Sequence, residues 1–131
     1  KISCLMATCG RVDRVAASIQ CYVRQRYSAR DLIILSQGNI EAITKLAQEA
    51  AVQSGTSVVV VEAPSSLSLG AMRNTLLELS TGQLVCQWDD DDLYDTERLI
   101  TQYKAIRSED AVASLYTQFI KYFETTGDMY W

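Results

Sequence analysis

The chain has 131 residues, 48% of them hydrophobic and one of them proline, with a formal net charge of −4. This is the composition of a globular domain with a buried core, not that of a disordered chain. The negative charge argues against a nucleic-acid backbone as the main partner, and no apolar run approaches the roughly 20 residues that a membrane span requires.

Histidine is absent, and the four cysteines form no Cys-x-x-Cys pair. Zinc sites and catalytic Ser/His or Cys/His pairs therefore lack a usual partner. Three of the cysteines lie in apolar segments, so we interpret them as reduced, buried thiols rather than a disulfide framework. With no visible signal peptide, we expect the protein in the cytoplasm or at the cytoplasmic face of a membrane.

Strand and helix patterns alternate along the first half of the chain. Residues 2–7 are a short apolar run typical of a buried strand. Apolar side chains at helical spacing predict a helix over residues 12–26, and residues 31–35 form a second apolar strand. Asn39 is then a suitable N-cap for a helix that ends at Gly55.

The alternation continues in the second half. The β-branched residues 57–61 predict a third strand, which a helix over residues 69–80 follows. Residues 83–88 form a fourth strand, and Asp95 can cap a helix that reaches Arg107.

Two further strands are expected near the end of the chain, at residues 111–116 and 119–124, with a hairpin turn at 125–128. The whole pattern predicts an α/β fold. It is a three-layer α/β/α sandwich around a mainly parallel, Rossmann-like sheet, with an antiparallel hairpin at the C-terminal end.

Four consecutive carboxylates, at residues 89–92, follow the fourth strand directly. Two like charges about 4 Å apart repel each other by about 1 kcal/mol in water and by about 4 kcal/mol at an effective dielectric of 20. A fold can hold such a cluster through solvent screening, protonation or a bound cation. Because oxygen ligands suit hard cations, we predict a metal site at this strand end.

Polar segments also follow the first two strands, at residues 8–11 and 36–39. The carboxyl ends of parallel strands lie at one edge of a sheet, so these segments should converge with the carboxylates. Arg73 lies near the start of the third helix, where a guanidinium and the positive helix end can together bind an anion. A metal site beside an anion site indicates a metal-bound phosphate or diphosphate.

Two motifs in this order are quite specific. Residues 70–74 (Gly-Ala-Met-Arg-Asn) and 88–92 (Trp-Asp-Asp-Asp-Asp) resemble the Gly-x-Ala-Arg-Asn segment and the apolar-Asp-x-Asp-Asp motif of the family 2 glycosyltransferases, which have a GT-A fold. Residues 5–11 and 25–27 are similar to weaker patterns of this family. The resemblance covers most of residues 2–107, the nucleotide-binding half of the family's fold.

The resemblance implies a role for each site residue. Asp89 and Asp91 would form the Asp-x-Asp pair that contacts the ribose and binds Mn²⁺ or Mg²⁺ on the donor diphosphate. The expected metal ligands are Asp91, Asp89 and Asp92. The expected nucleotide-sugar-binding residues are Thr8, Arg11, Gln37, Arg73, Asn74, Asp89 and Asp90.

The implied function is metal-dependent transfer of a sugar, with inversion, from a nucleoside-diphosphate sugar to an unknown carbohydrate, lipid or protein acceptor. We expect residues 1–131 to form a single GT-A donor-binding domain of a longer transferase. The catalytic base would lie beyond Trp131, as would any part that associates with a membrane. Donor binding with little or no transfer is therefore expected of this chain alone.

Two departures from the family pattern leave an alternative open. Gly10 replaces the asparagine usual in the family, and residues 36–39 (Ser-Gln-Gly-Asn) replace the usual Asp-Asp-Gly-Ser. Gln37 can still hydrogen-bond a uracil, so we expect a UDP-sugar as the donor. The alternative is a degenerate, non-catalytic scaffold or nucleotide-binding module. A sugar-nucleotide nucleotidyltransferase is a weaker rival, because it would need a glycine-rich basic loop after the first strand.

Overall fold

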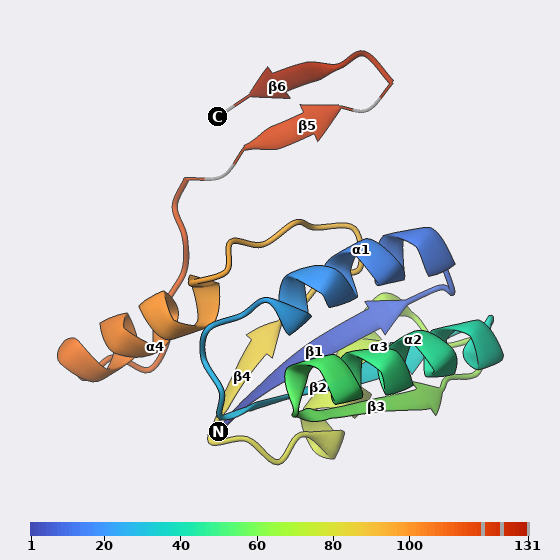
Figure 1. Ribbon diagram of the computed structural model, residues 1–131, viewed down its shortest axis with the longest axis horizontal. Coiled ribbons are helices and arrows are strands. Elements are labelled where there is room, and N and C mark those ends of the chain that lie inside the picture. The colour runs from blue at the N-terminus through green and yellow to red at the C-terminus, as the bar shows by residue number, and fades with distance from the viewer. Residues whose placement is uncertain (119, 124, 131) are drawn as a thin grey trace. The chain divides into compact units, whose positions relative to one another are not determined.

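The structure is a computed structural model that describes residues 1–118, 120–123 and 125–130 (Figure 1). The chain divides into two compact units, Lys1–Leu99 and Ile100–Trp131. The first unit carries all the predicted site residues.

The first unit is built on a four-stranded parallel sheet with the strand order β3-β2-β1-β4. Its strands are β1 (Ile2–Thr8), β2 (Arg30–Ser36), β3 (Ser57–Glu62) and β4 (Leu84–Gln87). Thr8 lies opposite Ser36, the last residue of β2, and Leu5 lies opposite Gln87, the last residue of β4. All four strands therefore end at one edge of the sheet, as the sequence predicts.

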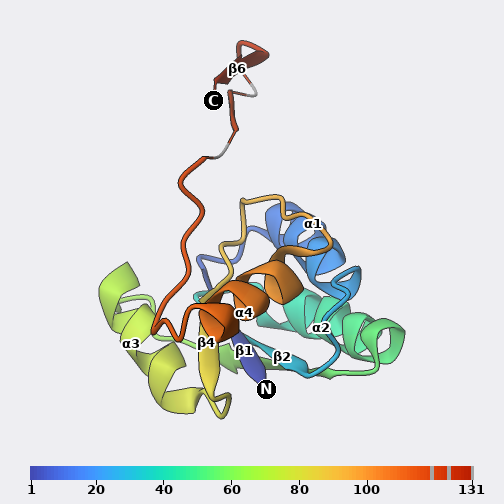
Figure 2. The same cartoon turned by 90° about the vertical axis from the view of Figure 1, so that its left-hand side faces the viewer.

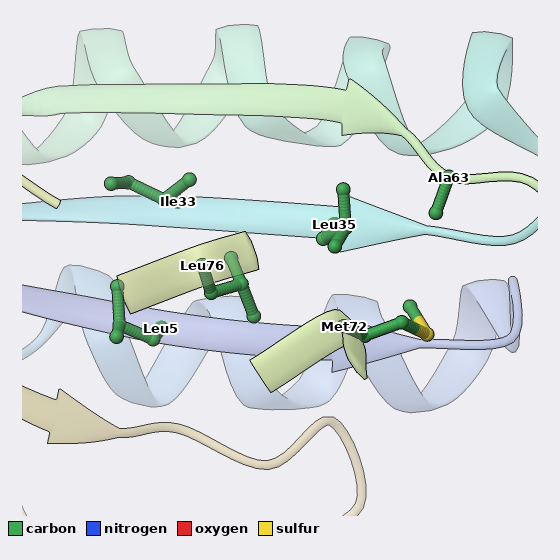
Figure 3. Packing of buried hydrophobic residues seen from close by; sticks show 6 residues of the cluster. All are labelled: Leu5, Ile33, Leu35, Ala63, Met72 and Leu76. Carbon is green, nitrogen blue, oxygen red and sulfur yellow. The ribbon is translucent and has the colours of Figure 1, made fainter. Parts of the chain in front are cut away.

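Helices cover both faces of this sheet (Figure 2). The helices of the first unit are α1 (Val12–Val23), α2 (Ile40–Ser54) and α3 (Leu69–Leu79). Leu5 and Leu35 belong to a buried cluster with Met72 and Leu76 of α3, while α1 and α2 lie behind the sheet in the view of Figure 3. The predicted three-layer arrangement with a mainly parallel sheet is therefore confirmed.

The start of α2 differs in mechanism from the prediction. Asn39 precedes the helix but has left-handed backbone angles, with φ of 48°, and its side chain caps no helix N–H. Its Nδ2 instead donates to the carbonyl of Gly10, 2.8 Å away. Asn39 therefore occupies the predicted N-cap position, but its side chain makes no capping hydrogen bond because a tertiary partner takes the amide. Gly55 does end the helix, with φ of 65°, as expected.

The end of α1 and the start of α4 (Arg98–Ser108) are also shifted by a tertiary contact. Gln25, predicted to be helical, is a buried residue just after α1. Its Nε2 donates to the carbonyl of Asp95 at 2.6 Å, and its Oε1 accepts from the N–H of Leu99 at 3.1 Å. Asp95 forms a turn with Glu97, so α4 begins later than the sequence predicts.

The second unit contains an antiparallel hairpin of β5 (Lys121–Phe123) and β6 (Asp128–Tyr130). The N–H of Gly127 donates to the carbonyl of Phe123 at 2.7 Å, and Gly127 has φ of 74°, which confirms the predicted turn. The predicted strand over 119–124 begins and ends at residues outside those described.

The strand predicted over residues 111–116 is wrong. Their apolar side chains are exposed at Val112 and Leu115, and the segment pairs with no strand among the described residues. A β-branched or aromatic composition favours a strand only where a neighbouring strand is present to pair with it.

None of the helices in the described ranges combines the length and apolar character needed to cross a bilayer.

Candidate functional site

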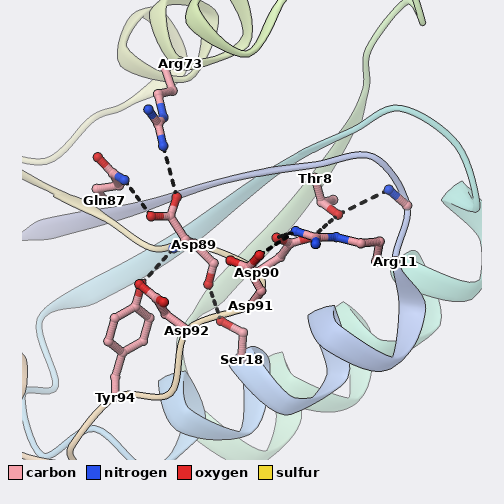
Figure 4. Close-up of polar contacts among 11 residues, drawn as sticks. Thr8, Arg11, Ser18, Arg73, Gln87, Asp89, Asp90, Asp91, Asp92 and Tyr94 are labelled. Carbon is pink, nitrogen blue, oxygen red and sulfur yellow. Dashed lines mark hydrogen bonds and ion pairs between the residues drawn. The ribbon is translucent and has the colours of Figure 1, made fainter. Parts of the chain in front are cut away.

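The ends of β1 and β4 bring the first site residues together (Figure 4). The N–H of Trp88 donates to the carbonyl of Leu5 at 2.9 Å, so the pairing with β1 continues just past β4. Asp90 is thereby placed beside Thr8, whose hydroxyl donates to the Asp90 carboxylate at 2.5 Å. Both residues are buried.

Arg11, in the turn after β1, neutralises two of the four carboxylates. Its guanidinium contacts both oxygens of Asp90, at 2.5 and 3.3 Å, and reaches one oxygen of Asp91 at 3.0 Å. The Asp90 side chain is 4% exposed, and those of Arg11 and Asp91 are 47% and 48% exposed. The hydrogen bond to Asp90 raises the pKa of Arg11 above its ordinary value, so this guanidinium stays charged.

A second arginine approaches the same carboxylate run from α3. Arg73 donates to one oxygen of Asp89 at 3.3 Å, and Gln87 donates to the other at 2.6 Å. The sequence predicted Arg73 near the carboxylates, and the structure places it there. Asn74, the next residue on α3, is exposed, and its predicted role in donor binding stays a prediction.

One residue that was not predicted from the sequence, Ser18, holds the backbone at the start of this run. Ser18 of α1 donates from its hydroxyl to the carbonyl of Asp89 at 2.8 Å. The carbonyl of Ser18 accepts from the indole of the buried Trp88 at 3.3 Å. A serine inside a helix gives no sequence signal of such a role, because it is visible only once α1 and β4 are packed together.

Tyr94 was also missed. Its hydroxyl accepts from the N–H of Asp89 at 2.9 Å and donates to the Asp92 carboxylate at 3.2 Å. Its ring lies 4.3 Å from the Trp88 ring, and the Arg98 guanidinium lies 3.9 Å from the centre of the Tyr94 ring. Burial raises the pKa of this hydroxyl, so Tyr94 remains a neutral donor across the physiological range.

Gln37 lies at the same edge of the sheet but turns its side chain elsewhere. Its N–H donates to the carbonyl of Thr8 at 2.9 Å. Its side-chain Nε2 donates to the carbonyls of Pro64 and Leu67, at 2.9 and 2.8 Å. Both amide hydrogens therefore close the loop after β3, which leaves the side-chain oxygen as the part of this amide that could contact a nucleotide base.

The carboxylates have the right chemistry for a hard cation, but they do not converge on one. In the described part of the chain, no three Asp, Glu, Cys or His side chains are grouped so that they could hold a metal ion. Asp89, Asp90 and Asp91 each contact an arginine, and of the four carboxylates Asp91 and Asp92 are exposed. The side chains alone form no metal cage. They fit a cation held by one or two carboxylates together with substrate phosphates, as is usual for Mg²⁺.

A mainly parallel sheet covered by helices on both faces is the fold that this chain shares with GT-A glycosyltransferases. Residues 3–130 match the family model described as "Glycosyl transferase family 2". The chain belongs to this family. A search of curated proteins finds no match.

Solved structures with the same fold include TarS of S. aureus, with a TM-score of 0.69 at 16% identity over 84% of this chain and 20% of TarS. TarS residues 1–349 in complex with UDP-GlcNAc give a TM-score of 0.69 at 17% identity, over 83% of this chain and 31% of that one. The mannosyltransferase PcManGT of Pyrobaculum calidifontis, in complex with GDP-Man and Mn²⁺, gives 0.67 at 16% identity, over 80% and 32%. This chain therefore spans a fifth to a third of these proteins.

Proposed function

We propose that this chain binds the nucleoside-diphosphate sugar donor of a family 2 glycosyltransferase that transfers its sugar with inversion. The observation that carries the proposal is the meeting of Arg11 and Arg73 with the carboxylate run at one edge of the sheet. Two guanidiniums flank the same acidic segment. Guanidiniums bind phosphate oxygens, and carboxylates together with phosphates hold Mg²⁺, so this edge offers partners for both parts of a metal-bound diphosphate.

Arg11 and Arg73 are the groups we assign to the donor phosphates. Their side chains are 47% and 44% exposed, so each guanidinium has free surface on which to bind a phosphate oxygen. A guanidinium binds phosphate through two parallel hydrogen bonds. Thr8 and Asp90 are buried beneath Arg11, so their role in donor binding is to orient this arginine.

Mn²⁺ or Mg²⁺ is the cofactor we propose, with Asp91 as its main ligand and Asp89 and Asp92 beside it. The exposed Asp91 and Asp92 are the carboxylates with room for an additional partner. The structural neighbour PcManGT was solved with GDP-Man and Mn²⁺, which supports testing a divalent cation at this site. When bound, such a cation would stabilise negative charge on the departing nucleoside diphosphate.

A carboxylate base that deprotonates the acceptor hydroxyl completes the proposed reaction. No residue of this chain is assigned to that role, so donor binding without efficient transfer is the behaviour we propose for the chain alone. UDP is the preferred nucleotide in this proposal, and the TarS complex with UDP-GlcNAc supports testing it first. The acceptor class and the cytoplasmic location remain predictions from the sequence.

Calorimetric titration with UDP and with GDP, each in Mn²⁺, Mg²⁺ or EDTA, tests this function. We expect UDP to bind in Mn²⁺ and binding to weaken at least about tenfold, or about 1.4 kcal/mol, in Asp91→Asn. Asp110→Asn is the matched control, because Asp110 is also exposed and its φ of 48° is one that asparagine tolerates.

Absence of binding by either nucleotide in every buffer would contradict the proposal and favour the non-catalytic scaffold. The observation that keeps this alternative open is the Gln37 amide, which is committed to the loop carbonyls of Pro64 and Leu67. Binding that EDTA leaves unchanged would contradict the metal requirement alone.

A further inference from the structure

Two of the four cysteines lie directly opposite each other on neighbouring strands. Cys4 of β1 is the register partner of Cys86 of β4 in the parallel pair. Opposed residues point to the same face of a sheet, and neighbouring strands are about 4.8 Å apart. That spacing lies within the Cα separations of about 4.4–6.8 Å that a disulfide spans, so the sheet places the two cysteines within bonding reach of each other.

The two thiols differ in exposure and in pKa, as expected for a pair that reacts with a disulfide one thiol after the other. Cys4 is fully buried, and Cys86 is partly exposed at the outer strand of the sheet. Burial raises the pKa of the Cys4 thiol, while a hydrogen bond with Cys4 and the charge of Arg98 lower the pKa of Cys86. Cys86 is therefore the thiol that an external reagent reaches first, and Cys4 is in contact with it.

We propose that Cys4 and Cys86 are a redox-active pair that closes to a cross-strand disulfide when the protein meets a low-molecular-weight disulfide such as oxidised glutathione. The Cys86 thiolate attacks one glutathione sulfur, the glutathione S–S bond breaks, and one glutathione thiolate leaves. The Cys4 thiol then loses its proton and attacks the Cys86 sulfur of the mixed disulfide, releasing the second glutathione. Both cysteine sulfurs are oxidised, and one glutathione disulfide is reduced to two thiols.

All four thiols are free in the structure, in agreement with the reduced state expected from the sequence, but only Cys4 is fully buried. Cys9 is exposed and Cys21 is partly exposed, but neither is a register partner of another cysteine. They are the natural competitors for the oxidant. A reagent that simply oxidised the most accessible thiol would modify Cys9 rather than join Cys4 to Cys86.

The positions of the three methionines allow a direct test on the unmodified chain. Cyanogen bromide cleaves after Met6, Met72 and Met129, so Cys4 lies on fragment 1–6, Cys9 and Cys21 on 7–72, and Cys86 on 73–129. The folded chain is incubated with oxidised glutathione, its remaining thiols are alkylated, and it is cleaved in acid and analysed by mass spectrometry. Glutathione disulfide leaves methionine intact, so cleavage stays complete.

We expect fragment 1–6 joined to fragment 73–129, lighter by about 2 Da than the sum of the two, because two thiol hydrogens are lost. Dithiothreitol should separate the fragments. Cys9→Ser should give the same product, and Cys86→Ser should not give it.

Cys4 found fully alkylated while Cys86 carries glutathione would overturn the proposal, as would fragment 7–72 joined to 73–129. The same reaction on the chain unfolded in urea is the control, because it tests whether the fold is needed to bring Cys4 and Cys86 together. If the unfolded chain gives the 1–6 to 73–129 product as efficiently as the folded chain, the fold does not pair these thiols and the inference fails.

Discussion

Asp90 and Asp91 are neighbours in the sequence, bear the same charge and contact the same arginine, yet we predict different effects when each is changed to asparagine. Asp90 is 4% exposed and accepts hydrogen bonds from Thr8 and Arg11. Asp91 is 48% exposed, and its carboxylate contacts Arg11 at the surface. Asp90→Asn should destabilise the fold, and Asp91→Asn should leave stability nearly unchanged.

The magnitude follows from burial. A hydrogen bond to a charged group contributes about 1.5–3 kcal/mol, and asparagine at position 90 would retain one acceptor while pointing an NH₂ group toward a donor. Arg11 is half exposed and can recover hydration, which moves the estimate to about 2 kcal/mol. The exposed pair of Arg11 with Asp91 is worth less than about 0.5 kcal/mol.

Urea unfolding followed by circular dichroism measures both variants against the unchanged chain, and equal slopes show that the change lies in stability rather than in compactness. Equal stability of the two variants would refute the reasoning, because it would mean that the burial of Asp90 has no energetic consequence. In nucleotide titrations, the order should reverse, with Asp91→Asn losing more binding.

Three further predictions concern residues that the sequence analysis did not single out. Tyr94→Phe removes the hydroxyl that accepts from Asp89 but keeps the ring, so it should lower stability by about 1 kcal/mol and weaken UDP binding; unchanged affinity would show that Tyr94 does not position the carboxylates. Burial raises the pKa of Tyr22 to about 12 from its ordinary value near 10, so folding favours the neutral hydroxyl. The stabilisation that this hydroxyl gives the folded state is complete below pH 10 and is lost as the pH rises from about 10 to about 12. Tyr22→Phe should therefore lose less stability over that range, and parallel curves would disprove the assignment. Gly82→Ala would place a Cβ 2.6 Å from the N atom of Ser3, so thermal unfolding should show a loss of about 1–3 kcal/mol, and a wild-type melting curve would contradict it.

The four strands of the parallel sheet were predictable because each is a short apolar run with a turn after it, and the sheet followed from the alternation with helices. The predictions failed where a side chain had a partner from a distant segment. Asn39 lies at the N-cap position of α2 but makes no capping hydrogen bond, because its amide donates to Gly10, and α1 stops early because Gln25 bonds to Asp95. Such contacts join segments far apart in the sequence, and a local pattern carries no information about them.

The sequence predicted which residue types form the candidate site and at which edge of the sheet they lie. It did not predict which side chains pair with each other. The sequence placed Arg73 and Arg11 near the carboxylates, and both lie there. It could not distinguish the buried Asp90 from the exposed Asp91, because four identical residues in a row carry no periodic signal. That distinction arises only when β1 and β4 are side by side and Thr8 meets one carboxylate.

The turns that follow β1 and β2 fit together so closely that they constrain each other's sequences. A Cβ on Gly10, where φ is +84°, would lie 2.9 Å from the carbonyl oxygen of Gly38, and Asn39 already fills the adjacent space. Placing a larger residue such as asparagine at position 10 would therefore require a compensating change in the other turn. Randomising one turn at a time would discard such residues, whereas a library varying both turns together could recover them, so these two turns are best redesigned through paired substitutions.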